Sequence, residues 1–183
     1  MRVEPIKDKG VIIDCIEYLQ RTSPRNATLF ALGIYTGLRI SDILKLRVRD
    51  VKGKNRLEIK QKKTGNYVYI PVSPELKKIL NEYTKDKGSN EYLIKSREGY
   101  NKPITRNMAY IILNDMADLL GIDAVGTHTM RKTAGYHLYN ASGKDIGLVM
   151  QILGQKDQGS TLRYIGISDM DAEKLIKKLS YYN

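Results

Sequence analysis

Paired helix start and stop signals divide this chain into short helices, and they limit its fold more than any other feature of the sequence. Ser23 and Pro24 form a cap and first-turn pair, and the apolar helix that follows ends at Gly37. Thr105 caps a longer apolar segment that stops at Gly121. With apolar residues spaced three and four apart, these signals predict helices at about residues 8–21, 24–36, 41–47, 74–83, 105–120, 128–140, 145–153 and 169–179.

Two segments alternate with the period of a β-strand. Residues 56–60 and 67–72 are separated by a turn that contains Gly65, which is a β-hairpin signal. Tyr67 and Tyr69 follow this alternation, so we interpret them as packing residues and not as platforms for stacked bases. Residues 91–95 resemble a short third strand. The sequence therefore predicts an α+β fold that is mainly helical, with a small three-stranded antiparallel sheet. The 183 residues suit a single domain, 1–183.

The composition excludes several classes of protein. The single cysteine, Cys15, cannot form a disulfide within the chain, and one Cys with two His cannot build a standard structural zinc site. The longest apolar run is far shorter than the roughly 20 residues of a membrane-spanning helix. The first ten residues include Arg2, Glu4, Lys7 and Asp8, and no apolar core of a signal peptide follows them. We therefore expect a cytoplasmic protein without a metal, a cofactor or a membrane partner.

Positive charge is concentrated in one stretch. Lys and Arg outnumber Asp and Glu by 31 to 20, a net charge of +11. Between Lys45 and Lys63, nine basic residues and two acidic ones contribute +7 of this excess. A solvated lysine-rich face and a surface that grips the DNA backbone both explain such a cluster, since basic side chains bind DNA by displacing counterions from phosphates. The excess favours nucleic acid as the partner, with a membrane surface second.

Four short motifs carry residues suited to phosphate chemistry. Arg39 directly follows a glycine-ended helix, and Asp42 lies near enough to steady its guanidinium, although a surface ion pair would look the same. Lys62 and Lys63 lie at the predicted hairpin tip, where a lysine can deliver a proton to a leaving oxygen or simply be solvated.

The other two motifs lie in the second half of the chain. His128 and Arg131 share one face at the start of a helix, where anions are favoured. Tyr164 follows a Leu-Gly-Gln sequence that ends in Gln155, and a tyrosine nucleophile needs nearby cations because a free phenol has a pKa of about 10. Each motif by itself is also compatible with packing or a solvated surface. We interpret the second histidine, His137, as structural because it lies on a different helical face.

The order of the motifs resembles the catalytic domain of the tyrosine recombinases, the phage-integrase family, over about residues 25–167. The resemblance implies that Arg39 and Arg131 hold the scissile phosphate, with Asp42 supporting Arg39. His128 would be a phosphate ligand and acid or base. Lys63 would protonate the leaving 5′ oxygen, and Tyr164 would form a 3′-phosphotyrosyl link without metal or ATP. Gln155 occupies a position where the family usually has His or Trp, and it can hydrogen-bond but cannot exchange protons.

The resemblance also predicts the partners. We expect double-stranded DNA and other copies of the chain in a DNA-bound synaptic tetramer, in a cytoplasmic protein associated with the nucleoid. The residues expected to bind the DNA backbone are Lys45, Arg47, Lys60, Lys62, Lys132 and Lys156. The N-terminal core-binding domain of typical integrases is missing from this sequence. Met1 and the coherent first helix favour a natural single-domain chain, although a truncated chain would look much the same. Its tail helix, within residues 168–183, packs either in trans on a neighbouring copy or in cis.

Three other functions remain open at this stage. The first is a catalytically weak or inactive DNA-binding relative that regulates recombination sites, which Gln155 and the missing clamp domain motivate. The second is a type IB topoisomerase-like enzyme, which uses similar chemistry without site specificity. The third is a basic protein with no role on DNA.

Overall fold

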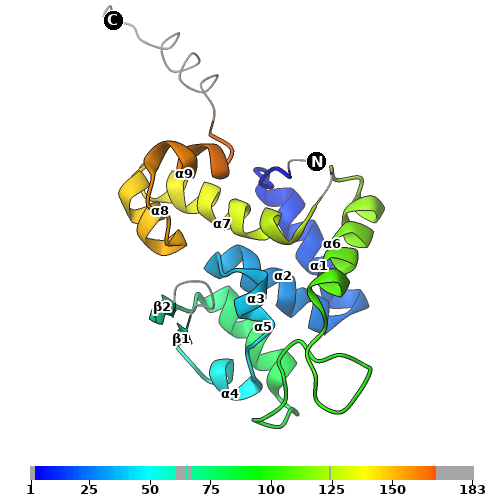
Figure 1. Ribbon diagram of the computed structural model, residues 1–183. Helices are drawn as coiled ribbons and strands as arrows, with labels where there is room; N and C mark the ends of the chain where they lie inside the picture. Colours follow the sequence, from blue (N-terminus) through cyan, green and yellow to red (C-terminus); the bar gives the residue numbers. More distant parts are fainter. Residues whose placement is uncertain (1–2, 61–64, 66, 124, 168–183) are drawn as a thin grey trace, which may run out of the picture.

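The computed structural model describes residues 3–60, 65, 67–123 and 125–167. Its helices and strands follow one another along the chain as Figure 1 shows. They are α1 (Lys9–Thr22), α2 (Pro24–Thr36), α3 (Ile40–Ile43), α4 (Val48–Val51), β1 (Arg56–Lys60), β2 (Tyr67–Pro71), α5 (Pro74–Thr84), α6 (Arg106–Leu120), α7 (Thr127–Ala141), α8 (Ile146–Leu153) and α9 (Gln158–Tyr164).

Helix α2 is the centre of the fold. It packs against α1, α5 and α7, and most of its side chains are buried. Its bounds agree with the predicted ones because both caps form: the Ser23 side chain accepts a hydrogen bond from the Asn26 N–H, and Gly37 ends the helix in the left-handed conformation with φ of 63°. This turn directs the chain into α3, so the helix ends where the Arg39 motif begins.

The hairpin forms as predicted, with β1 antiparallel to β2 and Leu57 opposite Ile70. Leu57, Ile59 and Ile70 point into the core, while Tyr67 and Tyr69 lie on the other face and are 57% and 52% exposed. The packing interpretation of these two tyrosines is therefore wrong. On the outer face, the Arg56 guanidinium lies 4.8 Å from the centre of the Tyr69 ring.

The predicted third strand is wrong for the residues that the structure describes, since their sheet has two strands. Residues 91–95 make isolated bridges instead: Tyr92 pairs with Arg47, and Lys95 pairs with Pro103. Leu93 and Ile94 are adjacent and both fully buried, which does not fit the alternation of a strand on a sheet surface. Residues 91–95 therefore run through the core and hydrogen-bond to residues outside the hairpin, so they do not extend its sheet.

Three more elements differ from the prediction or lie outside it. The helix expected at 41–47 overlaps only α3, which ends at Ile43; residues 44–47 are not helical, and α4 begins at Val48, after the predicted range. Helix α9 was not predicted, and the Asp157 side chain caps it by accepting from the Ser160 N–H over 2.6 Å. The predicted terminal helix at 169–179 lies outside the described residues.

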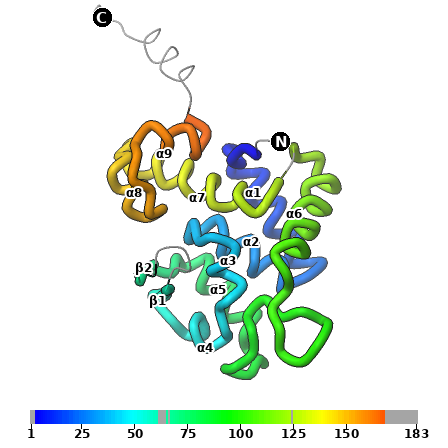
Figure 2. The backbone as a smooth tube through the Cα atoms, in the orientation of Figure 1, coloured from blue at the N-terminus to red at the C-terminus, as the bar shows by residue number. Residues whose placement is uncertain are grey.

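The buried apolar side chains form one large core and one small cluster. The small cluster contains Val149, Leu153 and Ile165, which are fully buried where α7, α8 and α9 meet. These three helices lie together at one end of the molecule, above α2 and the hairpin in the view of Figure 2. Within the described ranges, no helix is long and apolar enough to span a bilayer.

Candidate active site

Arg131 is a buried cation at the meeting point of three helices. It lies in the second turn of α7 and is 4% exposed. Its Nη1 donates to the carbonyl of Gly37 at the end of α2, and its Nη2 donates to the carbonyl of Leu153 at the end of α8. Both acceptors lie at helix C-termini, which carry partial negative charge, so two helix dipoles stabilise the guanidinium and fix its orientation.

Tyr164 and His128 are in direct contact although 36 residues separate them. The phenol oxygen lies 3.3 Å from Nδ1 of His128, and the two rings are nearly perpendicular at 87°. His128 is in the first turn of α7, and Tyr164 is the last residue of α9. The phenol also hydrogen-bonds with Arg131. The structure therefore brings the predicted histidine, arginine and tyrosine together.

The site is strongly cationic, and the pKa values of its residues reflect this. Burial raises the pKa of Tyr164, while the charges of Arg131 and Arg39 oppose that rise. Burial also lowers the pKa of His128, and four surrounding cations lower it further; in decreasing order of effect they are Arg106, Arg131, Lys132 and Arg39. Because these cations repel one another, an anion such as a phosphodiester would be strongly stabilised between them.

Arg106 was not identified from the sequence. It is the exposed first residue of α6, and of the charges that lower the pKa of His128, its charge has the largest effect. A cation at a helix N-terminus opposes the helix dipole. An arginine directly after the Thr105 cap is therefore a feature that could have marked Arg106 as a residue of interest.

Arg39, Asp42 and Gln155 lie on the elements that border the buried guanidinium. Arg39 precedes the first residue of α3, and Asp42 in α3 is 1% exposed. Burial lowers the pKa of Arg131, the charge of Arg39 lowers it further, and the charge of Asp42 opposes this fall. Gln155 follows the left-handed Gly154 that ends α8, and its N–H donates to the Met150 carbonyl over 2.9 Å. Gln155 thus lies two residues from the Leu153 carbonyl that binds Arg131.

A basic groove runs from α3 to the hairpin. It has a volume of about 1060 Å³, and Asp42 and Gly65 are among its lining residues. Two of the predicted DNA-backbone residues, Lys45 and Lys60, line it. The other charged lining residues are Arg49, Asp50, Lys54, Arg56 and Glu58. Basic side chains outnumber acidic ones along the groove, so it offers a surface for a phosphate backbone.

The other predicted DNA-backbone residues are placed differently. The Arg47 guanidinium packs 4.3 Å from the centre of the Tyr92 ring and donates to the carbonyl of Asn90. Lys132 is 6% exposed and donates to the Val3 carbonyl over 2.6 Å, so its ammonium faces the interior. Lys156 is exposed between α8 and α9. The predicted hairpin lysines, Lys62 and Lys63, lie outside the described residues.

Three of the four motifs lie in the described residues, and their arrangement around one cationic site agrees with the sequence pattern of the phage integrase family, which matches residues 9–170. The chain belongs to this family. Among the described residues, no group of three or more His, Cys, Asp or Glu side chains could hold a metal ion.

Similar proteins include other members of the family. The chain is 43% identical over 167 residues to a protein of Bacillus subtilis (strain 168) named "Probable integrase/recombinase YoeC", and the match covers 91% of each chain. It is 25% identical over 176 residues to a Staphylococcus epidermidis protein named "Tyrosine recombinase XerC", covering 92% of this chain and 58% of that protein. The match to XerC therefore spans little more than half of the relative.

Solved structures share the fold at low sequence identity. The crystal structure of XerA recombinase superposes with a TM-score of 0.78 at 19% identity, over 98% of this chain and 65% of that one. The Tn1549 transposon integrase, in complex with a circular intermediate DNA, gives a TM-score of 0.72 at 19% identity, over 98% and 66%. The predicted fold, that of a tyrosine recombinase catalytic domain, is confirmed apart from the number of strands.

Proposed function

We propose that this chain is a site-specific DNA recombinase that cuts and rejoins DNA strands through a 3′-phosphotyrosyl intermediate. The observation that carries the proposal is the contact between the Tyr164 phenol and His128 Nδ1, 3.3 Å apart, beside the anchored guanidinium of Arg131. This is a nucleophile with a proton acceptor and a phosphate-binding cation at one point. Family membership supports the same reaction, as do the crystal structures of XerH site-specific recombinase in pre-cleavage and post-cleavage complexes with difH substrate.

The described side chains support a mechanism for the attack step of strand cleavage. In the proposal, Arg39 and Arg131 hold the non-bridging oxygens of the scissile phosphate and oppose the charge that builds in the transition state. The lowered pKa of His128 keeps its imidazole neutral near pH 7, so Nδ1 can accept the phenolic proton during attack. The bond from Tyr164 Oη to phosphorus forms as the bond from phosphorus to the 5′ oxygen breaks.

Religation follows the same path in reverse. During cleavage, the leaving 5′ oxygen takes a proton from a donor. We assign Lys63 as this donor on the basis of the family resemblance. A 5′ hydroxyl then attacks the phosphotyrosyl bond, and Tyr164 recovers its proton. The covalent link conserves the energy of the phosphodiester, so religation needs no ATP. Arg39, Arg131 and His128 oppose the charge on the phosphate, which is the role a metal ion would otherwise have.

The proposed partner is double-stranded DNA, bound along the basic groove that Lys45 and Lys60 line. The solved relatives include a lambda integrase dimer bound to a COC′ core site. We propose that copies of this chain assemble on DNA as a synaptic tetramer and that the protein is associated with the nucleoid. For residues 168–183, packing on a neighbouring copy in this assembly and packing in cis both remain proposals.

The test is a nicked suicide substrate made from the DNA that flanks the gene. The wild-type chain should form a covalent adduct that resists denaturing electrophoresis, and Tyr164→Phe should form none. Tyr100→Phe is the matched control, because Tyr100 is 96% exposed and should not affect the adduct. Identical gels for the wild type and Tyr164→Phe would refute catalysis. Salt-sensitive DNA binding without any adduct would favour a non-enzymatic DNA-binding protein.

A further inference from the structure

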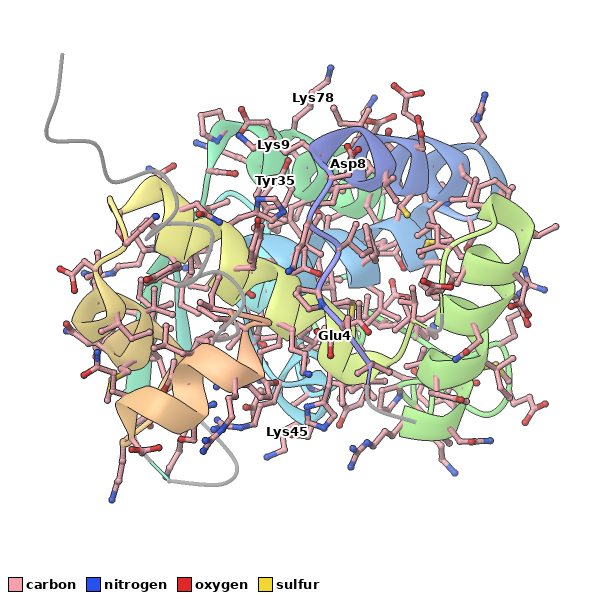
Figure 3. The ribbon with its side chains drawn as sticks, turned by 90° about the horizontal axis from the view of Figure 1, so that it is seen from above. Glu4, Asp8, Lys9, Tyr35, Lys45 and Lys78 are labelled. Carbon is pink, nitrogen blue, oxygen red and sulfur yellow. The ribbon has the colours of Figure 1, made fainter. Side chains whose placement is uncertain are left out.

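The segment that precedes the first helix, Val3–Lys7, lies across α7 close to the candidate active site. Figure 3 shows it passing over this helix, with Glu4 on the segment and Asp8 at the start of α1. The Ile6 N–H donates to Thr133 Oγ1 over 2.9 Å, and the Ile6 carbonyl accepts from His137 Nε2 over 3.0 Å. This N-terminal segment is therefore attached to two successive turns of α7.

Lys132 connects the N-terminal segment to the Tyr164 phenol. Its ammonium donates to the Val3 carbonyl over 2.6 Å and lies 5.4 Å from the centre of the Tyr164 ring. A cation within about 6 Å of an aromatic face is attracted to it. Because Lys132 is 6% exposed, its ammonium is enclosed between the segment and the ring. The position of the Tyr164 ring thus depends on the Lys132 side chain, which the N-terminal segment binds through the Val3 carbonyl.

The same segment holds the backbone just beyond Tyr164. Lys7 Nζ donates to the Gly166 carbonyl over 3.1 Å. A Cβ on Gly166 would lie 2.8 Å from Cγ of Pro5, so the Pro5 ring packs directly on this backbone. Gly166 also has a φ of 76°, which favours glycine. The N-terminal segment therefore contacts both Lys132, whose ammonium lies over the Tyr164 ring, and the backbone at Gly166, two residues beyond Tyr164.

Helix α9 needs such support because it is short and lies outside the large core. It has seven residues, fewer than an isolated helix needs to be stable. Ile165, which follows it, belongs to the small apolar cluster with Val149 and Leu153. Ile6 belongs instead to the large core and is 7% exposed. The N-terminal segment thus ties the small cluster that carries Tyr164 to the large core.

We propose that the N-terminal segment Val3–Lys7 positions the nucleophile, by holding the Lys132 ammonium against the Tyr164 ring and the Gly166 backbone against Pro5 and Lys7. The proposal rests on the proposed function, because it takes Tyr164 as the nucleophile. It makes Lys132 a positioning residue that acts through Tyr164 and not a contact to the DNA backbone. It also makes residues far from the DNA-binding groove determinants of the cleavage rate.

Three perturbations test the proposal in the full-length chain. The first combines Val3→Gly, Glu4→Gly and Pro5→Gly, which raises the conformational entropy of the segment and removes the Pro5 contact. The second, Lys132→Met, keeps the length of the side chain but removes the ammonium. The third, Lys7→Met, removes the bond to Gly166 and the contact of the ammonium with the Tyr136 ring, whose centre lies 5.4 Å away. Lys7 is exposed, so folding should be preserved. Lys9→Met is the matched control, since Lys9 is an exposed lysine two residues away.

The readout separates positioning from DNA binding. At saturating suicide substrate, the triple glycine variant and Lys132→Met should form the adduct about tenfold to a hundredfold more slowly than the wild type, and Lys7→Met about threefold to tenfold more slowly. The half-saturating DNA concentration should stay within about twofold of the wild type in every variant. Lys9→Met should match the wild type in both quantities. Wild-type rates in the triple glycine variant and Lys7→Met would overturn the proposal, as would a loss confined to DNA affinity.

Hydrogen exchange without DNA tests the same proposal independently of catalysis. The amides of Ile165 and Gly166 bond to Thr161 and Arg163 in the last turn of α9. Mass spectrometry of peptides covering residues 158–167 should show faster exchange in the triple glycine variant and in Lys7→Met, but not in Lys9→Met. Unchanged exchange in both variants would overturn the proposal. A wild-type chain that forms no adduct but shows this pattern would refute the proposed function and leave the role of the segment supported.

Discussion

Replacing Gly135 with alanine should push the Tyr164 helix away from α7. Gly135 lies on α7 where that helix meets α8 and α9, and a Cβ there would lie 2.6 Å from Ile165 Cγ2 and 2.8 Å from Leu153 Cδ1. Non-bonded carbon atoms pack at about 3.5–4.0 Å, so the contact to Ile165 must lengthen by about 1 Å. Because Ile165 directly follows Tyr164 and is fully buried, it cannot move without moving the phenol.

The expected loss of activity is much larger than the loss of stability. Alanine in a helix interior is about 1 kcal/mol more favourable than glycine. Overpacking of a core costs about 1–3 kcal/mol, so the net destabilisation should be about 0–2 kcal/mol. A displacement of about 1 Å at a reacting group can lower a rate about a hundredfold. Gly135→Ala should therefore remain folded and form the adduct about a hundredfold more slowly.

The assay is single-turnover adduct formation on saturating suicide substrate, with thermal unfolding of the same preparation. Gly159→Ala is the matched control, since its Cβ on α9 would meet its nearest atom only at 3.9 Å and should leave the rate unchanged. Adding Ile165→Ala to Gly135→Ala removes the clashing Cγ2, so the double variant should lose less than the two single effects combined. A rate for Gly135→Ala within about threefold of the wild type would refute the reasoning.

Three further predictions concern DNA affinity, pH and thiol reactivity. Lys60→Gln should reduce the slope of log DNA affinity against log salt concentration by about 0.9, the value for one phosphate contact. Lys9→Gln should leave this slope unchanged, and fluorescence anisotropy measures both. An unaltered slope for Lys60→Gln would place Lys60 outside the DNA contact. Burial, followed by neighbouring cations, lowers the pKa of His128, so stability should be fully present above the unfolded pKa of about 6.5 and fall as the pH drops below it. His128→Gln should lose less stability on acidification than the wild type, as measured by urea unfolding, and equal losses would contradict this. Burial raises the pKa of the Cys15 thiol to about 11, so iodoacetamide should modify it only in the urea-unfolded chain, and rapid modification of the folded chain would show that the thiol is accessible.

Local sequence signals predict those helices whose ends carry a cap. Helix α2 is predicted to within a residue because Ser23, Pro24 and Gly37 act on their own neighbours and need no distant partner. The third strand is wrong because apolar spacing in residues 91–95 cannot reveal which backbone they pair with, and they bond to Leu46 and Ile104 instead of the hairpin. Helix α9 was missed because its first residues are polar and include Gly159, which is typical of a loop. The cap that Asp157 makes on the Ser160 N–H was therefore not recognised as a helix start.

The site was predictable in its residue types but not in its interior contacts. His128 and Arg131 share a helical face by their spacing alone, and the structure places them together as expected. Lys132 is a different case, because its burial depends on the N-terminal segment, 129 residues away along the chain at Val3. The effect of Arg106 on His128 similarly depends on how α6 packs against α7. Such contacts are set by tertiary packing, which local patterns do not encode.

The buried guanidinium of Arg131 explains why motifs so far apart belong to one pattern. Its two acceptors, Gly37 and Leu153, lie 94 and 22 residues away, and each belongs to a helix end where a glycine takes the left-handed conformation, with φ of 63° at Gly37 and 57° at Gly154. A helix C-terminus carries about half a negative charge, so two such ends together offset the cost of burying the cation. Lysine lacks the planar fork needed to bond both carbonyls at once. The glycines of the Gly-Leu-Arg and Leu-Gly motifs are therefore required by the same arginine that the His-x-x-Arg motif supplies, and this cationic site forms only when all three motifs fold against one another.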